Sequence, residues 1–324
     1  MHTRTDHTPQ VCPICSTEVL TFVSIDGRPL AICAYCRHIA WRVMPTEGEL
    51  SAYYAAAYSR DHDQIAIQTS ARDYYRQHAG DLARKVGTGT NLTLLDYGCA
   101  WPTMLEEAKS ISAHSRLIGA DYDQAALEHG AAIGLEMLSP DDLVQKLGEG
   151  SVDILRFSHV IEHMRDPLAT LRELARLLKD GGLIYITQPI FPALMPEARP
   201  AGIKDAVYPE HLHFFTAASL NIAVSAMGAD IFEIAAFQKE EDVAAIFEGG
   251  IDHPHAAEIN KPLAHLTPGN FHRLGGYPTF IGENVYLYAR KRGEADASKP
   301  AARRLAGPRS FKSRLSGIIK RISR

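Results

Sequence analysis

The sequence lacks any run of about 20 apolar residues, and its first ten residues contain no apolar stretch. The longest uncharged candidate for a membrane span, residues 214–229, is interrupted by the polar side chains of Thr216, Ser219, Asn221 and Ser225. This segment is too polar for a bilayer helix. We therefore expect neither a secretory signal nor a transmembrane helix, and we predict a cytoplasmic protein.

The chain also lacks an overall excess of charge of one sign. It has 34 Lys and Arg against 38 Asp and Glu, with 46% hydrophobic residues, a composition that excludes a fibrous or wholly disordered chain. Twelve basic and two acidic residues follow position 289, so this tail carries +10, and the remaining 22 basic and 36 acidic residues give the body −14. Because such a body repels phosphates, no nucleic-acid partner is expected.

Cysteine is scarce, and four of the five cysteines fall within the first forty residues. Cys12 and Cys15 form one C-x-x-C pair, and Cys33 and Cys36 form a second one after seventeen intervening residues. Two such pairs can place four thiolates around one zinc ion, whose role would be structural because no coordination position stays open. Reduced unliganded thiols or a redox pair are the alternative. We expect a zinc-ribbon module over residues 1–44, with a hairpin between the two pairs.

The rest of the chain alternates between short apolar runs typical of strands and segments whose apolar residues recur at helical spacing. After a helical connector over residues 45–90, short apolar strands are predicted at 92–95, 117–120, 135–138, 152–157 and 183–187. Helices are predicted between these strands at 103–112, 124–133, 141–147 and 167–178. A helix at 216–227 and strands at 231–237 and 284–289 follow. This order predicts an α/β fold over residues 91–291, with a mostly parallel sheet and helices on both faces.

Two segments interrupt or follow this α/β pattern. The proline-rich passage 189–209 reads as a substrate-facing loop, and residues 238–283 read as an insertion. Residues 292–324 read as a flexible basic tail, in which residues 311–324 place five apolar side chains on one stripe of a basic amphipathic helix. Such a helix is typical of attachment to the inner membrane face or to an acidic partner, and a solvated tail is the alternative.

The first predicted strand runs into a turn and then a helix, at Asp96-Tyr97-Gly98-Cys99-Ala100-Trp101-Pro102. Asp121 follows 25 residues after Asp96, at the end of the next strand. In nucleotide-binding folds a small residue lets the backbone approach the ligand, helix N–H groups bind its anionic part and a second acid binds ribose hydroxyls. Alone, the same residues are also compatible with a tight structural turn.

Further motifs follow in a fixed order. Asp96, Asp121, Asp153, Glu162-His163 and Gly181-Gly182 succeed one another between residues 92 and 187, and Glu210-His211-Leu212-His213-Phe214-Phe215-Thr216 extends the series. This series resembles class I S-adenosylmethionine-dependent methyltransferases, which implies their Rossmann-like sheet and their cofactor. By that resemblance the cofactor site comprises Asp96, Gly98 and Ala100 at the methionyl part, Asp121 at the ribose, Asp141 or Asp142 at the adenine, and His159.

Tyr208, Glu210 and His211 are the candidate catalytic residues. The cofactor supplies an activated methyl group, so the protein has to align the acceptor and remove its proton. His211, oriented by Glu210, is our candidate base, and a structural histidine is the alternative. The Tyr-x-Glu-His segment and the cysteine-rich N-terminus are similar to those of sugar C-methyltransferases.

We therefore predict methyl transfer from S-adenosylmethionine to a small polar acceptor, such as a sugar nucleotide or glycan precursor. Two alternatives stay open. The first is an RNA methyltransferase with a zinc module, against which the acidic body argues. The second is a non-catalytic scaffold that lost its cofactor, because Ala100 and Pro102 stand where the family has glycine.

Overall fold

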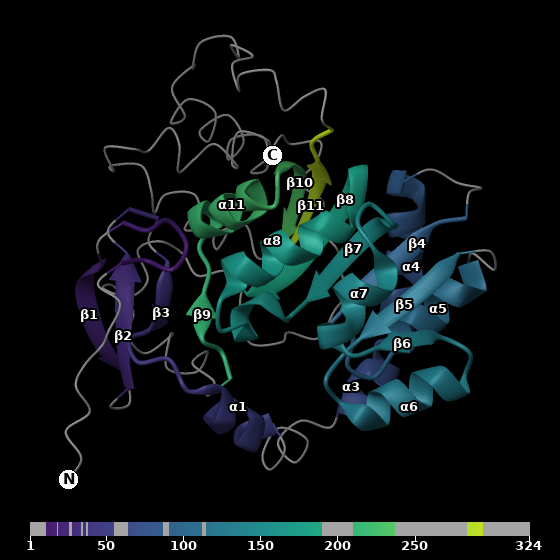
Figure 1. The fold of residues 1–324 in the computed structure, drawn as a ribbon, viewed down its shortest axis with the longest axis horizontal. Helices are drawn as coiled ribbons and strands as arrows, with labels where there is room; N and C mark the ends of the chain where they lie inside the picture. The colour runs from purple at the N-terminus through teal and green to yellow at the C-terminus, as the bar shows by residue number, and fades with distance from the viewer. Residues whose placement is uncertain are drawn as a thin grey trace, which may run out of the picture.

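The computed structural model describes residues 11–17, 19–25, 28–33, 35–36, 38–54, 64–86, 91–111, 115–189, 210–236 and 284–293 (Figure 1). The predictions for Tyr208, for the insertion 238–283 and for the helix 311–324 lie outside these residues. Within the described ranges, no helix is both long and apolar enough to cross a bilayer.

A seven-stranded sheet forms the centre of the molecule, in the order β10-β11-β8-β7-β4-β5-β6 (Figure 1). Its strands are β4 (Thr93–Tyr97), β5 (Arg116–Ala120), β6 (Glu136–Leu138), β7 (Val152–Ser158), β8 (Leu178–Pro189), β10 (Ala229–Ala236) and β11 (Asn284–Lys291). Parallel pairing joins β6, β5, β4, β7 and β8, whereas β11 is antiparallel to both of its neighbours. The predicted α/β fold with a mostly parallel sheet is confirmed.

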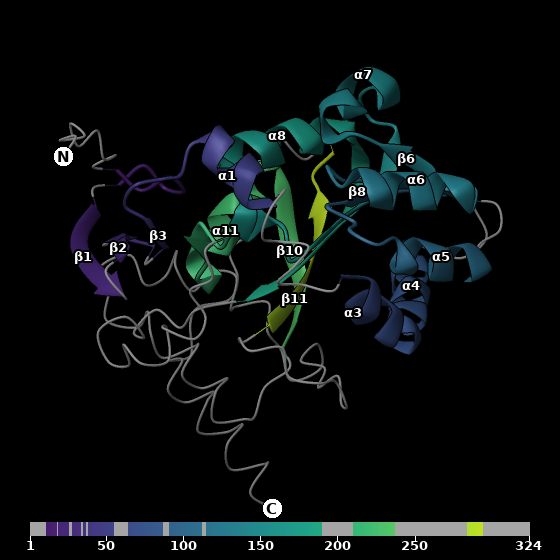
Figure 2. The same cartoon turned by 90° about the horizontal axis from the view of Figure 1, so that it is seen from below.

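Helices cover both faces of this sheet. The helices of the described residues are α1 (Glu47–Tyr53), α3 (Gln64–Ser70), α4 (Arg72–Val86), α5 (Thr103–Ile111), α6 (Gln124–Ala132), α7 (Leu143–Leu147), α8 (Pro167–Leu177) and α11 (Ala217–Ala226), with short 3₁₀ turns η2 (Pro140–Asp142) and η3 (Ile161–His163). Figure 2 shows α3, α4 and α5 on one side of the molecule and α7 and α8 on the other. Two separate apolar clusters fill the two interfaces, one including Leu82 and Leu105 and the other including Phe157 and Leu171.

The helix boundaries follow the capping residues of the sequence. Thr46 and Glu49 form a capping box at the start of α1, since the Glu49 N–H donates to Thr46 Oγ1 over 3.2 Å and the Thr46 N–H donates to Glu49 Oε2 over 2.8 Å. Asp166 caps α8 by accepting the Ala169 N–H over 3.0 Å. The connector is several helices rather than one, because α3 ends at Ser70 and α4 begins at Arg72.

A second, four-stranded sheet has the order β1-β2-β3-β9 (Figure 1). The strands β1 (Val19–Ile25) and β2 (Arg28–Cys33) form the predicted hairpin, and β3 (Ile39–Trp41) follows them. The fourth strand, β9 (His213–Phe214), lies much later in the sequence and pairs with β3. The N-terminal module therefore has a strand from residues that the sequence analysis assigned entirely to the α/β domain.

Candidate functional site

The four N-terminal cysteines converge at one point. Their sulfur atoms all lie within 4.8 Å of one another, with 3.7 Å between Cys12 and Cys36 and 3.4 Å between Cys15 and Cys33. A tetrahedral zinc ion with bonds of about 2.3 Å separates its sulfur ligands by roughly 3.8 Å. Backbone N–H groups point at the sulfurs, as where Ile14 donates to Cys12 over 3.4 Å. This donor set fits a closed, structural zinc site.

The loop after β4 has an unusual backbone. Gly98 has φ +69°, and a Cβ added there would lie 2.4 Å from Val160 Cγ2, so only glycine fits this position. Ala100 has φ +46°, a left-handed conformation that favours glycine. The amides of Gly98 and Cys99 donate to Ala120 O over 2.7 and 3.1 Å. These bonds hold the loop against the end of β5, at the carboxyl edge of the sheet.

Asp121 joins this loop to the start of α6. Its Oδ2 accepts the Ala100 N–H over 2.7 Å, and its Oδ1 accepts the Asp123 N–H over 2.9 Å. Burial raises the pKa of Asp121, while these two bonds lower it. Asp141 lies after the neighbouring strand β6 and accepts the hydroxyl of Tyr122 over 3.1 Å. The structure thus places Asp121, Asp141 and the 69% exposed ring of Tyr122 along one stretch of the carboxyl edge.

The side chain of Asp96 is buried in the protein interior. It is 1% exposed, and its Oδ1 pairs with Arg156 Nη1 of β7 over 2.6 Å. Burial raises the pKa of Asp96, and Arg156 opposes that shift. The Arg156 guanidinium also lies 5.8 Å from the ring centres of Tyr75 and Tyr185. A direct contact of Asp96 with a ligand stays a prediction. The partner Arg156 was missed, although an arginine inside an apolar strand was a visible signal.

Glu162 is a buried carboxylate at the same edge. It is 2% exposed, and no described residue donates a hydrogen bond to either of its oxygens. His159 Nδ1 approaches Oε1 to 3.6 Å, and His159 itself has φ +54°, held by its N–H bond to Thr187 O over 2.8 Å. Burial opposes ionisation of Glu162, but the imidazoles of His159, His163 and His211 lower its pKa to about 2.

Glu162, His163 and His211 lie together and form what we call the Glu162 group. One ligand atom of each lies within 4.8 Å of the other two, and the imidazole centres are 4.9 Å apart. His163 Nδ1 lies 3.0 Å from Glu210 O, so it carries a proton and leaves Nε2 with a lone pair. Burial lowers the pKa of His163 to about 4, which keeps the ring neutral near pH 7. The group can accept a proton, and its atoms also suit a divalent cation.

The structure places Glu210 differently from the interpretation of the sequence. Its side chain is buried, and its Oε2 accepts the hydroxyl of Tyr53 from α1 over 2.8 Å. The carboxylate grouped with His211 is that of Glu162. Glu210 lies in a turn before β9, and its side chain points to Tyr53 rather than to His211. Orientation of His211 by Glu210 therefore stays a prediction.

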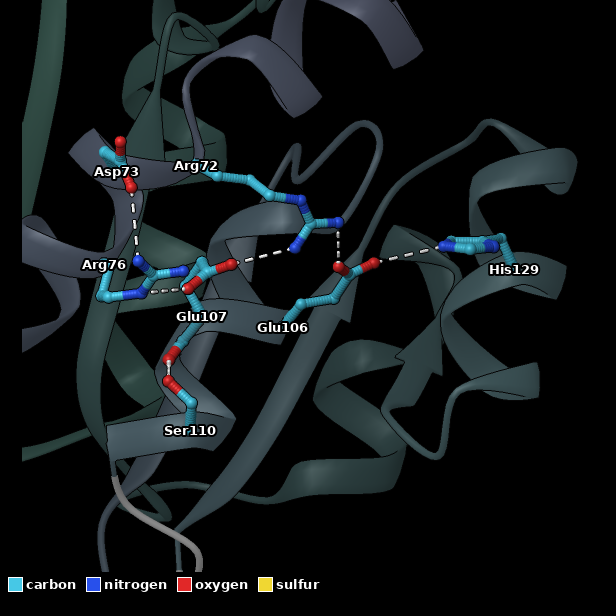
Figure 3. Close-up of polar contacts among 7 residues, drawn as sticks. All are labelled: Arg72, Asp73, Arg76, Glu106, Glu107, Ser110 and His129. Atoms are coloured by element: carbon cyan, nitrogen blue, oxygen red, sulfur yellow. Dashed lines mark hydrogen bonds and ion pairs between the residues drawn. The ribbon is translucent and has the colours of Figure 1, made fainter.

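A polar network links α4, α5 and α6 near the loop after β4 (Figure 3). Arg72 of α4 bonds to both Glu106 and Glu107 of α5, over 2.5 and 2.9 Å. Glu106 also lies 3.2 Å from His129 of α6. The His129 ring stacks on Trp101, with centroids 3.9 Å apart and planes 17° from parallel. The network thus connects three helices to the loop that carries Gly98.

Comparison with known proteins adds a family to this geometry. Residues 68–234 match the model of the family described as "Methyltransferase domain". The chain is 31% identical over 140 residues to an uncharacterized 37.1 kDa protein in transposon TN4556 of Streptomyces fradiae, covering 41% of this chain and 39% of that one. It is 34% identical over 117 residues to the ubiquinone biosynthesis O-methyltransferase of Ruegeria pomeroyi, covering 33% and 46%.

The chain thus spans less than half the length of either relative. Among solved structures, a putative methyltransferase from Bacillus halodurans is 16% identical, with a TM-score of 0.43 over 66% of this chain and 99% of that one. The family match covers the loop after β4, Asp121, the Glu162 group and β9. The chain therefore belongs to the methyltransferase-domain family.

Proposed function

We propose that the chain transfers a methyl group from S-adenosylmethionine to a hydroxyl oxygen of a small acceptor. The observation that carries this proposal is the loop after β4, where Gly98 and Ala100 adopt left-handed conformations and the Ala100 N–H is bound by Asp121. Such a loop leaves room for a ligand against the backbone, and the carboxylate beside it suits ribose hydroxyls. The exposed ring of Tyr122 offers an apolar face for the adenine.

The Glu162 group supplies the residues that act on the acceptor. When bound, S-adenosylmethionine would supply an activated methyl group to the acceptor oxygen, with S-adenosylhomocysteine as the leaving group. The hydroxyl proton passes to the imidazole of His211, and the buried charge of Glu162 stabilises the imidazolium that forms. A phenolic hydroxyl, with a pKa of about 10, is acidic enough for such a base to accept its proton during methyl transfer.

This chemistry and one relative support the choice of acceptor class. The Ruegeria pomeroyi protein is an O-methyltransferase of ubiquinone biosynthesis. A hydroxylated aromatic ring is therefore our first candidate, ahead of the sugar nucleotide that the sequence suggested. The acidic charge of the body supports a small-molecule acceptor over RNA.

Zinc at the four cysteines is part of the same proposal. The sulfur separations and the N–H groups directed at them support a structural ion in the N-terminal module. Metal analysis of the purified chain and of Cys33→Ser tests it: we expect about one zinc per wild-type chain and a loss of zinc in the variant. A wild-type protein that is as stable without zinc as with zinc would contradict the proposal of a structural ion.

An acceptor panel tests the reaction. The protein is incubated with methyl-labelled S-adenosylmethionine and either 3,4-dihydroxybenzoate or a nucleoside-diphosphate ketosugar. We expect label on the phenolic oxygen, and at least a hundredfold less in His211→Gln. Label on the ketosugar carbon alone would replace the phenolic acceptor with the sugar.

A further inference from the structure

The N-terminal module holds the backbone of the segment that carries His211. Trp41, the last residue of β3, donates its backbone N–H to Leu212 O over 3.1 Å and its indole Nε1–H to His211 O over 2.6 Å. Directly beyond them, β3 pairs with β9, with Ala40 opposite His213. Two consecutive carbonyls, one of them that of His211 itself, therefore accept from one tryptophan.

A second set of bonds ties the same segment to the cysteines. Thr216 Oγ1 donates to Cys36 O over 2.7 Å. His38, two residues after Cys36, lies 3.0 Å from His213 Nδ1 and 3.3 Å from Ser219 Oγ. All five residues are buried, so water does not replace these partners. The position of the segment thus depends on the fold of the cysteine loops.

The opposite side of the segment contacts the 3₁₀ turn η3. The Leu212 N–H donates to Glu162 O over 2.9 Å, and His163 Nδ1 lies 3.0 Å from Glu210 O. Leu212 is therefore bonded to Trp41 by its carbonyl and to Glu162 by its amide. The segment that carries His211 is therefore bonded to the module on one side and to η3, which carries Glu162, on the other.

We propose that the N-terminal module is the positioning element of the methyl-transfer site, with Trp41 as the positioning residue that acts through His211. This inference rests on the proposed function in that His211 is its base. The cofactor loop is held by other bonds, from Gly98, Cys99 and Ala100 to Ala120 and Asp121. Loosening the module therefore displaces the base and leaves cofactor binding in place.

Amide hydrogen exchange of the full chain tests the inference without an acceptor. Trp41→Phe keeps an aromatic ring but removes the indole donor to His211 O. We expect exchange in peptides covering residues 210–216 to accelerate at least tenfold, with residues 93–121 unchanged. Removal of the metal by a chelator should give the same local acceleration. Unchanged exchange over 210–216, or equal acceleration in both regions, would overturn the proposal.

Trp101→Phe is the matched control, because Trp101 is the only other tryptophan of the chain and stacks on His129. We expect it to leave exchange over 210–216 unchanged. In methyl transfer to 3,4-dihydroxybenzoate, Trp41→Phe should lower kcat about tenfold while KM for S-adenosylmethionine stays within twofold. A rise in that KM with kcat unchanged would contradict a positioning role.

Binding of S-adenosylhomocysteine separates this inference from the proposed function. Titration calorimetry should give dissociation constants within twofold of each other for wild type and Trp41→Phe. A wild-type chain that fails to bind would refute the proposed function, whatever the exchange shows. A wild type that binds, together with a Trp41→Phe variant that does not, would refute the positioning role alone.

Discussion

Ala100 donates its backbone N–H to Asp121 Oδ2 over 2.7 Å while it holds a left-handed conformation at φ +46°. An alanine pays about 1 kcal/mol for this conformation relative to glycine. The bond to the partly buried Asp121 carboxylate offsets that cost, because a charge-assisted bond is stronger than a neutral one. The sequence raised the question whether alanine abolishes cofactor binding, and this backbone is compatible with a bound cofactor.

Ala100→Gly should relieve the strain and keep the bond. We expect the free energy of unfolding to rise by about 0.5 kcal/mol, less than the full strain because glycine also gains freedom in the unfolded chain. Denaturant titration measures the change. A fall in stability would show that the alanine methyl contributes more by packing than its backbone costs.

Gly98→Ala should have the opposite effect. The added methyl would lie 2.4 Å from Val160 Cγ2, and the residue would keep φ +69°, so we expect a loss of about 2 kcal/mol or more and weaker cofactor binding. Adding Val160→Ala removes the two closest contacts but leaves Val160 Cβ at 3.2 Å and the backbone strain, so it should restore stability in part. Full restoration would show that the left-handed conformation costs little here.

The buried pair of Asp96 and Arg156 should be costly to break from one side. Asp96→Asn leaves the guanidinium buried without its carboxylate, so we expect a loss of about 3–5 kcal/mol. Glu149→Gln is the matched control, because Glu149 and Arg176 form an ion pair at the surface, where such pairs are worth about 0–1 kcal/mol. Equal losses in both variants would contradict the importance of burial.

Stability should fall as the pH drops from about 6.5 to 4. Burial lowers the pKa of both His163 and His213 to about 4, so in this range the unfolded chain binds protons that the folded chain does not. Each histidine then contributes a slope on the order of 1 kcal/mol per pH unit. Denaturant titrations at several pH values measure it, and His163→Asn should flatten the curve. An unchanged curve would show that His163 is protonated in the folded state.

Much of the fold was predictable, and the site was predictable only in part. Apolar runs and caps located β7 and α8, because Asp166 and Pro167 mark a helix start whatever packs against it. The strand β9 has two residues, too few for a periodic signal, and its partner β3 lies more than 170 positions away. The grouping of Glu162 rather than Glu210 with His211 depends on side-chain directions, which spacing along the chain does not give.

The central claim is that the carboxyl edge around Asp121 binds S-adenosylmethionine. Calorimetric titration of the metal-loaded chain with S-adenosylmethionine, repeated on Asp121→Ala, tests it most directly. The control is Asp180→Ala, at the start of β8, where Asp180 lies 3.9 Å from Lys291. We expect saturable binding by wild type and by the control, and at least tenfold weaker binding by Asp121→Ala. Absence of binding by wild type, or equal binding by all three, would contradict the claim.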